Sequence, residues 1–170
     1  MSAYPRTTLT CLALWTLVAG SAAAQNSDTF EVRAEVLDSC GISAEDLDFG
    51  TYDPISVTPT VGTATITATC TLLTVFDIGL DAGTGGTAVN DRSMVDDATG
   101  TETLDYSLSC AGLGVPACAV NWGDTPGTDT FTSVGTGLGI PVVVTGTIPA
   151  GQQVTPGIYR DNPVTATIYF

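Results

Sequence analysis

The chain of 170 residues contains no histidine and no lysine, and its only basic side chains are four arginines. Without histidine or lysine, the Ser-His, Cys-His and Ser-Lys pairs that activate a nucleophile cannot be assembled. These few basic residues stand against 18 acidic ones, which gives a formal net charge of −14. Nucleic acid and anionic membrane surfaces are bound through clustered basic residues, so the composition excludes both classes of partner.

Long apolar runs are also scarce, and the most apolar one lies near the N-terminus. Residues 9–20 follow Arg6 and are mainly apolar, and Ala22–Ala24 then supply the small residues of a signal-peptidase site. The run is shorter than the roughly 20 residues needed to span a bilayer. Residues 1–24, with Cys11 among them, are therefore predicted to be a signal peptide. The mature chain is expected to be secreted, without membrane insertion.

Cysteines are few, and their number after the predicted cleavage site is even: Cys40, Cys70, Cys110 and Cys118. An even number in an exported chain indicates two disulfides, for which three pairings exist. Cys110 and Cys118 bracket a segment with turn-forming glycine and proline, which favours a Cys110–Cys118 bridge and leaves Cys40–Cys70 as the second. Zinc sites favour C-x2-4-C spacings that this chain lacks, so no zinc site is expected.

Helical periodicity is lacking as well, and the pattern that recurs is the period-two alternation of β-strands. It marks residues 61–71, 75–82, 104–110 and 163–170, while 139–148 is more continuously apolar and is expected to be a central strand. These segments predict one all-β domain, an immunoglobulin-like sandwich of about six core strands. Glycine-rich connectors are expected at 81–102, 122–137 and 148–162.

The two ends of the predicted domain do not match each other. Residues 28–36, DTFEVRAEV, alternate like a β-strand although no partner strand precedes them. The apolar face of this segment consists of Phe30, Val32, Ala34 and Val36. The inward face predicted for the last strand consists of Val164, Ala166, Ile168 and Phe170. That strand runs to the last residue, so the strand that should cover its edge is expected to be missing.

An uncovered last strand would present unpaired N–H and C=O groups above an apolar groove. The amphipathic segment 28–36 has the pattern to fill such a groove. Only Leu37–Ser39 separate it from Cys40, without the glycine or proline that favours a chain reversal. The expected destination is therefore the groove of a neighbouring molecule, and such a head-to-tail contact builds a filament because it does not close on itself.

Several short motifs cover nearly the whole mature chain: LDFGTYDP (47–54), GTATITATCT (62–71), LDAGTGGT (80–87), NWGDTPG (121–127), GTIPAGQQVTPGIYRD (146–161) and VTATIYF (164–170). In this order they resemble the spore coat protein U domain family, which includes the pilin subunits of archaic chaperone–usher pili. The segment SCAGLGVPACAV (109–120), with its own cysteine pair, departs from the family pattern, which runs directly into a short loop before Trp-Gly-Asp.

The resemblance implies an incomplete immunoglobulin-like β-sandwich that lacks its final strand and is completed by donor-strand exchange. It implies a donor strand in residues 25–36, a pilin-like domain in 37–170 and an acceptor groove along Val164–Phe170. A periplasmic chaperone would first fill this groove and grip Phe170 with the C-terminal carboxylate. At an outer-membrane usher, the N-terminal segment of a neighbouring pilin would then replace the chaperone. The resemblance thus implies a structural subunit of a surface pilus for adhesion or biofilm formation, without cofactor or catalysis.

Other functions stay open from the sequence. A self-contained secreted coat or matrix-binding module would complete the same fold within one chain. A glycoside hydrolase needs paired carboxylates, and Glu45, Asp46 and Asp48 are the densest local group, but they read as solvated loop acids. Trp122, in the NWGD motif, is expected to be a packed loop aromatic rather than a platform on which a sugar stacks.

The acidic glycine-rich loops offer carboxylates that could bind calcium. Neither loop matches the spacing D-x-[DN]-x-[DN]-G of a calcium-binding loop, so the signal for such a site is weak. The carboxylates concerned are Asp91, Asp96, Asp97, Asp124 and Asp129.

Overall fold

The computed structural model describes residues 24–111, 118 and 121–170. The chain divides at Glu35 into an N-terminal unit and a second unit, Val36–Phe170, which contains all the strands of the described part. The predicted signal peptide lies outside the described residues except for Ala24. Throughout the described part no helix is long and apolar enough to cross a membrane.

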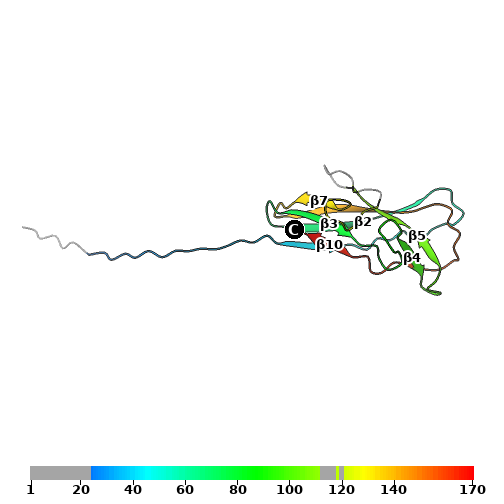
Figure 1. Cartoon of the computed structure of the whole chain (residues 1–170), viewed down its shortest axis with the longest axis horizontal. Coiled ribbons are helices and arrows are strands. Elements are labelled where there is room, and N and C mark those ends of the chain that lie inside the picture. Colours follow the sequence, from blue (N-terminus) through cyan, green and yellow to red (C-terminus); the bar gives the residue numbers. More distant parts are fainter. Residues whose placement is uncertain (1–23, 112–117, 119–120) are drawn as a thin grey trace, which may run out of the picture. The chain divides into compact units, whose positions relative to one another are not determined.

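The second unit is built from short and long strands that alternate with turns (Figure 1). The strands are β1 (Cys40–Ala44), β2 (Thr60–Cys70), β3 (Val75–Leu80), β4 (Ser93–Asp96), β5 (Thr103–Asp105), β6 (Ser107–Ala111), β7 (Phe131–Val134), β8 (Gly139–Ile148), β9 (Tyr159–Arg160) and β10 (Ala166–Tyr169).

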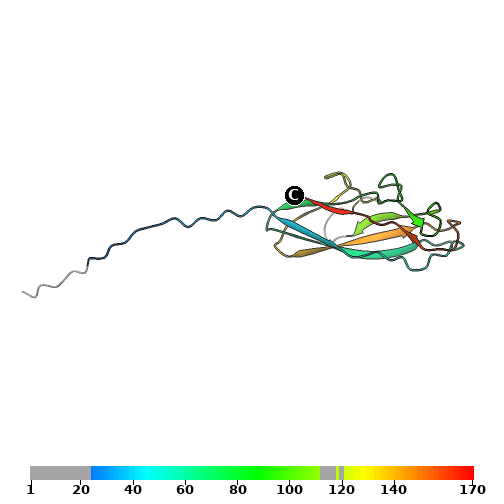
Figure 2. The same ribbon diagram turned by 90° about the horizontal axis from the view of Figure 1, so that it is seen from below.

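The strands form three antiparallel sheets, with the orders β1-β2-β8-β6, β10-β3-β7 and β5-β4-β9. Figure 2 shows β1 in cyan and β10 in red in different layers of the sandwich. Among the described residues, β10 pairs on one side only, with β3. The fold is therefore the expected all-β, incomplete immunoglobulin-like sandwich, in which no described strand covers the outer edge of β10.

Alternation of side chains between the two faces of a strand explains the core. Along β2, Ala64, Ile66, Ala68 and Cys70 are buried, while the threonines between them are half-buried or exposed. The same alternation buries Phe76, Ile78 and Leu80 in β3, and β8 lies between β2 and β6, the interior position expected from its apolar run. The long strands and their inward faces thus agree with the prediction from the sequence.

The predicted connectors are wrong in part, because β4, β7 and β9 lie within them. These strands have two to four residues, too few for an alternation that can be recognised. β7 pairs with β3, and β9 pairs with β4, and both partners are distant in the sequence. The predicted strand 104–110 is interrupted at Tyr106, whose backbone N–H donates to the carbonyl of Arg92.

The expectation that Phe170 points inward is also wrong, since its side chain is 62% exposed. The ladder between β10 and β3 ends with the pair Tyr169 and Asp77. Beyond that pair no strand hydrogen bonds hold the last residue against the core.

Both disulfides have the pairing expected from the sequence. Cys40 is bonded to Cys70, and the two residues are also register partners at the start of β1 and the end of β2. Cys110, in β6, is bonded to Cys118 across a sequence separation of 8. The first bridge therefore fastens β1, an edge strand, to the centre of its sheet.

Replacing Cys40 and Cys70 together by serine should lower the free energy of unfolding by about 2 to 4 kcal/mol. The reason is that the bridge closes a loop with a sequence separation of 30, which restricts the unfolded chain. Urea unfolding of the oxidised protein and the variant measures the difference. The matched variant Cys110→Ser with Cys118→Ser opens a shorter loop and should lose less, so a larger loss there would contradict this account.

Candidate functional site

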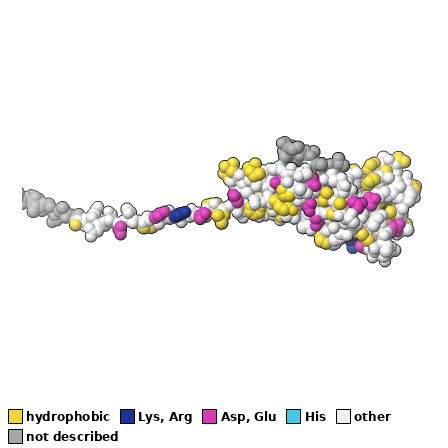
Figure 3. Space-filling view, in the orientation of Figure 1, with side chains coloured by type: hydrophobic (Ala, Val, Ile, Leu, Met, Phe, Trp, Pro, Cys, Tyr) yellow, Lys and Arg dark blue, Asp and Glu magenta, His cyan; other side chains and the backbone are white. Residues whose placement is uncertain are grey.

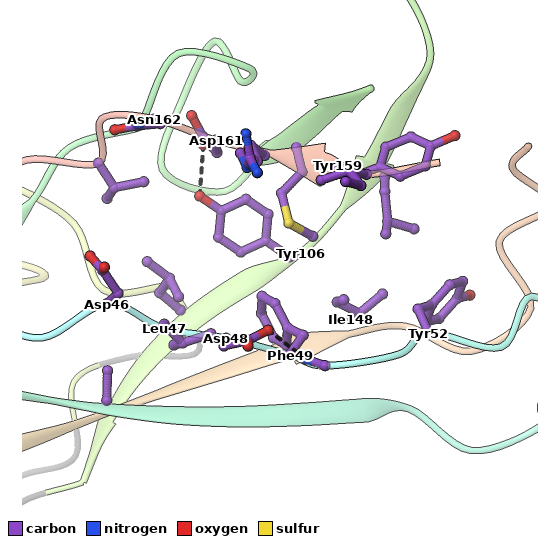
Figure 4. A pocket seen from close by; sticks show the side chains of 18 of the residues that line it. Asp46, Leu47, Asp48, Phe49, Tyr52, Tyr106, Ile148, Tyr159, Asp161 and Asn162 are labelled. Carbon is purple, nitrogen blue, oxygen red and sulfur yellow. Dashed lines mark hydrogen bonds between the residues drawn. The ribbon is translucent and has the colours of Figure 1, made fainter. Parts of the chain in front are cut away.

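A groove opens between the edges of two strands that belong to different sheets. β1 and β10 are edge strands, and within the described residues neither pairs with a strand on its outer side. The two strands contact each other. Beyond this contact, a groove of about 1020 Å³ lies between the segments 44–54 and 154–166 (Figure 4).

The floor of this groove is the hydrophobic core itself. Its residues come from both layers of the sandwich and are all at most 8% exposed. They are Ala64, Ile66, Leu80, Leu104, Tyr106, Leu108, Val144 and Ile148. Apolar side chains placed on this floor would complete the core, which is what an added strand of alternating pattern can supply.

One wall of the groove is the segment that follows β1. Leu47 and Phe49 turn from this segment toward the core, and the Phe49 ring packs edge-on against Tyr106 at a centroid distance of 6.1 Å (Figure 4). Two glycines that face each other across β2 and β8 make room for them. A Cβ atom on Gly146 would come within 2.6 Å of the Phe49 ring, and one on Gly62 within 3.0 Å of Leu47.

The opposite wall is held by a buried tyrosine and an aspartate. The Tyr106 hydroxyl donates a hydrogen bond of 2.7 Å to the Asp161 carboxylate, as Figure 4 shows. The other oxygen of Asp161 accepts from the backbone N–H and the hydroxyl of Thr84. Burial and the neighbouring carboxylate raise the pKa of Tyr106, so its hydroxyl stays a neutral donor. The wall that leads into β10 is thereby fixed to the core.

The residues predicted for the acceptor strand are brought only partly into the groove. Val164 and Ala166 line it, and both are half-buried. Ile168 is half-buried too but lies outside the lining, as does the exposed Phe170. The groove thus begins beside the first half of β10. There the outer edge of the strand has no hydrogen-bonding partner among the described residues.

The segment predicted to donate a strand forms no strand in residues 24–35, which are exposed throughout. Phe30 is 87% and Val32 83% exposed, and Val36, at the start of the second unit, is 86% exposed. Large apolar side chains that alternate on an exposed backbone indicate a segment whose partner is supplied by another element or molecule.

Other residues singled out by the sequence are explained by their surroundings. Trp122 is fully buried, and its Nε1–H donates to the carbonyl of Ile78 at 2.8 Å, so its reading as a packed loop aromatic is confirmed. Glu45, Asp46 and Asp48 are exposed loop residues on the rim of the groove. They are exposed, as expected from the sequence, and the Asp48 carboxylate also accepts from the backbone N–H of Gly50.

The acidic loops use their carboxylates mainly to hold their own backbone. Asp96 accepts from the backbone N–H of Thr99, and Asp129 accepts from that of Thr125. Asp97 forms an ion pair with Arg160 at 2.9 Å. In the part of the chain that the structure describes, no three metal-ligating side chains converge.

A buried arginine behind the groove floor was not predicted. Arg92 is 1% exposed, and its guanidinium donates to the carbonyls of Leu80, Asp81 and Trp122 at 2.6 to 2.9 Å. Burial lowers the pKa of this guanidinium, whereas Asp81 and other nearby acids raise it. Sequence patterns offer no signal for such a residue, because most arginines are exposed.

Comparison with known proteins places this chain in a family. The model of the Spore Coat Protein U domain matches residues 26–167. "Protein U" of Myxococcus xanthus is 37% identical over 139 residues, which cover 76% of this chain and 74% of that protein.

A solved structure has a similar fold: the CsuC-CsuE chaperone-tip adhesion subunit pre-assembly complex from archaic chaperone-usher Csu pili of Acinetobacter baumannii. The match has a TM-score of 0.52 and 21% identity, and it covers 79% of this chain but 40% of that chain. From the family match over most of its length and its identity with Protein U, the chain belongs to the Spore Coat Protein U domain family.

Proposed function

We propose that this protein is a secreted structural subunit of a surface pilus, in which residues 25–36 of one subunit fill the groove of the next. The observation that carries this proposal is the groove itself, which is floored by the core and flanked by two unpaired strand edges. The same chain supplies an exposed segment with the matching alternation. In strand addition of this kind, backbone hydrogen bonds provide affinity and alternate side chains in pockets provide specificity.

The donor segment fits the groove by its pattern and its apolar content. Phe30, Val32, Ala34 and Val36 would face the floor, while the charged residues between them would face solvent. Burying the three large side chains would contribute roughly 5 to 9 kcal/mol, before any cost of ordering the segment, at 1.5 to 3 per side chain. The added strand would also pair the free edge of β10.

Assembly then requires partners that protect the groove before the neighbouring subunit fills it. A periplasmic chaperone would occupy the edge Val164–Phe170 first, and an outer-membrane usher would exchange it for the donor segment of the next pilin. The complex of a chaperone with a tip adhesion subunit, whose fold this chain shares, supports this order of events. The resulting fibre would stand on the cell surface and serve adhesion or biofilm formation, with no catalytic step.

The proposal is tested by adding the donor segment back as a peptide. A peptide of residues 26–37 should raise the melting temperature of a chain that lacks residues 25–36 by about 5 to 10 °C at a concentration near 100 times its Kd. The reason is that the peptide binds the folded groove and not the unfolded chain. Differential scanning fluorimetry measures the shift.

The matched control peptide carries serine in place of Phe30 and Val32 and keeps the length and charge. It should give little or no shift. A second candidate function, suggested by the family's description, is a coat protein whose groove is closed within one chain. Absence of any shift with the parent peptide would favour that candidate and contradict the pilus proposal.

A further inference from the structure

One end of the second unit carries an exposed cluster of large apolar side chains. The cluster lies on the turn between β2 and β3, the start of β3, the end of β7 and the loop that follows β7. Its members are each between 45% and 76% exposed. They are Leu72, Leu73, Val75, Val134 and Leu138, and we call them the apolar platform.

The platform is rigid, because backbone hydrogen bonds join its two loops. The N–H of Leu73 donates to the carbonyl of Gly135 at 2.8 Å, and the N–H of Gly135 donates to the carbonyl of Thr74 at 2.7 Å. Leu73 has a φ of 68°, the sole positive value at a non-glycine residue in the described ranges. A large side chain in this unfavourable conformation, and exposed to water, indicates a residue kept for contact with a partner.

Asp38 and Ser39, which follow the proposed donor strand, are attached to the same turn. The hydroxyl of Thr74 donates to the Asp38 carboxylate at 2.8 Å, and the N–H of Thr71 donates to the carbonyl of Ser39 at 2.9 Å. Asp38 and Ser39 are therefore held beside Leu72 and Leu73. The proposed donor strand ends at Val36, only two residues before Asp38, and two residues span at most about 7 Å.

Because this distance is short, the platform must lie close to the subunit whose groove holds the donor strand. The groove is lined by Ala44 and Ala166 but by no earlier residue of β1 and no later residue of β10, so it lies away from the end where β1 begins. It extends along the segments that follow β1 and precede β10, where Tyr52, Pro54 and residues 154–158 line it. A donor strand that pairs antiparallel with β10 would end beside these residues, and the domain that follows it would lie there.

Exposed apolar side chains are also found beside these lining residues. Ile55 and Val57 follow Pro54 in the chain and are 81% and 92% exposed, and Ile158, across the groove, is 60% exposed. Figure 3 shows hydrophobic side chains gathered toward both ends of the second unit. The two ends thus offer apolar surfaces that a head-to-tail arrangement brings together.

We infer that the apolar platform of one subunit packs against Ile55, Val57 and Ile158 of the subunit whose groove holds its donor strand. The partner is thus a second copy of this chain, and the inference rests on the proposed function. This contact is separate from the donor strand and fixes the angle between neighbouring subunits. The contact buries apolar side chains that lie at both ends of the subunit.

The inference is tested by cross-linking in fibres of the full chain. Leu73→Cys and Val57→Cys in one chain, treated with a short thiol-reactive cross-linker, should give covalent ladders that persist after heat and denaturant have released the donor strands. The control pairs Leu73→Cys with Val143→Cys, which is partly exposed in the middle of β8. Fibres of the control should give no ladder above background.

Adding Leu72→Ser and Leu138→Ser to the cross-linking variant should lower the linked fraction about tenfold, which corresponds to about 1.4 kcal/mol. These fibres should still be SDS-resistant, because their donor strands are intact. Linking equal to that of the Val143→Cys control, or linking by Leu73→Cys alone, would overturn the inference and leave donor-strand exchange standing. If the cysteine variants form no SDS-resistant fibres although the parent does, Leu138→Cys takes the place of Leu73→Cys in the cross-linking test. Failure of the parent chain itself to form such fibres would count against the proposed function.

Discussion

Deleting residues 25–36 should abolish fibre formation and leave the β-sandwich folded. The deleted segment contributes no strand to the second unit, whose strands run from Cys40 to Tyr169. The truncated subunit would keep its groove and should still be bound by the chaperone, but it would have no strand to offer to a neighbour. SDS-resistant ladders on gels and electron microscopy of surface fibres measure assembly, and co-purification with the chaperone shows that the truncated subunit keeps a folded groove.

A matched pair of variants tests whether fibres need the apolar face of the donor segment or only the presence of the segment. Glu31→Gln with Glu35→Gln changes the face that would point to solvent and should preserve fibres. Phe30→Ser with Val32→Ser changes the face that would enter the groove and should lose them. If the truncated chain forms ladders as abundant as those of the parent, donor-strand exchange is the wrong mechanism.

Replacing Arg92 by alanine should lower the free energy of unfolding by about 3 to 5 kcal/mol. The guanidinium is the hydrogen-bond donor for the carbonyls of Leu80 and Asp81 at the end of β3 and for that of Trp122. Without it, these buried carbonyls lose charged donors and a cavity remains. Leu80 is also part of the groove floor, so the variant should bind the donor peptide less tightly as well. Chemical denaturation and peptide titration measure the two effects.

Arg160→Ala provides the control for charge. The Arg160 side chain is 62% exposed and pairs with Asp97 at the surface, so its loss should cost less than about 1 kcal/mol. Equal losses for the two arginine variants would mean that the buried hydrogen bonds of Arg92 are not what stabilises this region.

The long strands could be predicted because each has enough residues to show which face is buried. Alternation along β2 and β3 identified inward residues that the structure buries. β9 could not be found in this way, because it is held by a ladder of only two register pairs, between Val95–Asp96 of β4 and Tyr159–Arg160, and β4 itself has only four residues. Such strands form because the chain around them is folded, so no local sequence pattern predicts them.

The groove could be anticipated from the two ends of the sequence, but its walls could not. The excess strand at the start and the uncovered strand at the end indicated where a groove should lie. The hydrogen bond between Tyr106 and Asp161 joins residues 55 positions apart, and only the fold brings them together. Arg92 was missed for a similar reason, since its acceptors are backbone carbonyls, which every residue carries.

The position of the Cys40–Cys70 bridge has a mechanical consequence for a fibre under tension. Force transmitted along the donor segment would enter each subunit at Asp38 and Ser39, next to this bridge. The covalent bond passes the force directly to β2, which is paired along its length with β8. β1 therefore cannot be peeled from the sheet from its first residue onward. Stretching would act first on the non-covalent joints between subunits, which can re-form, while each subunit keeps its fold.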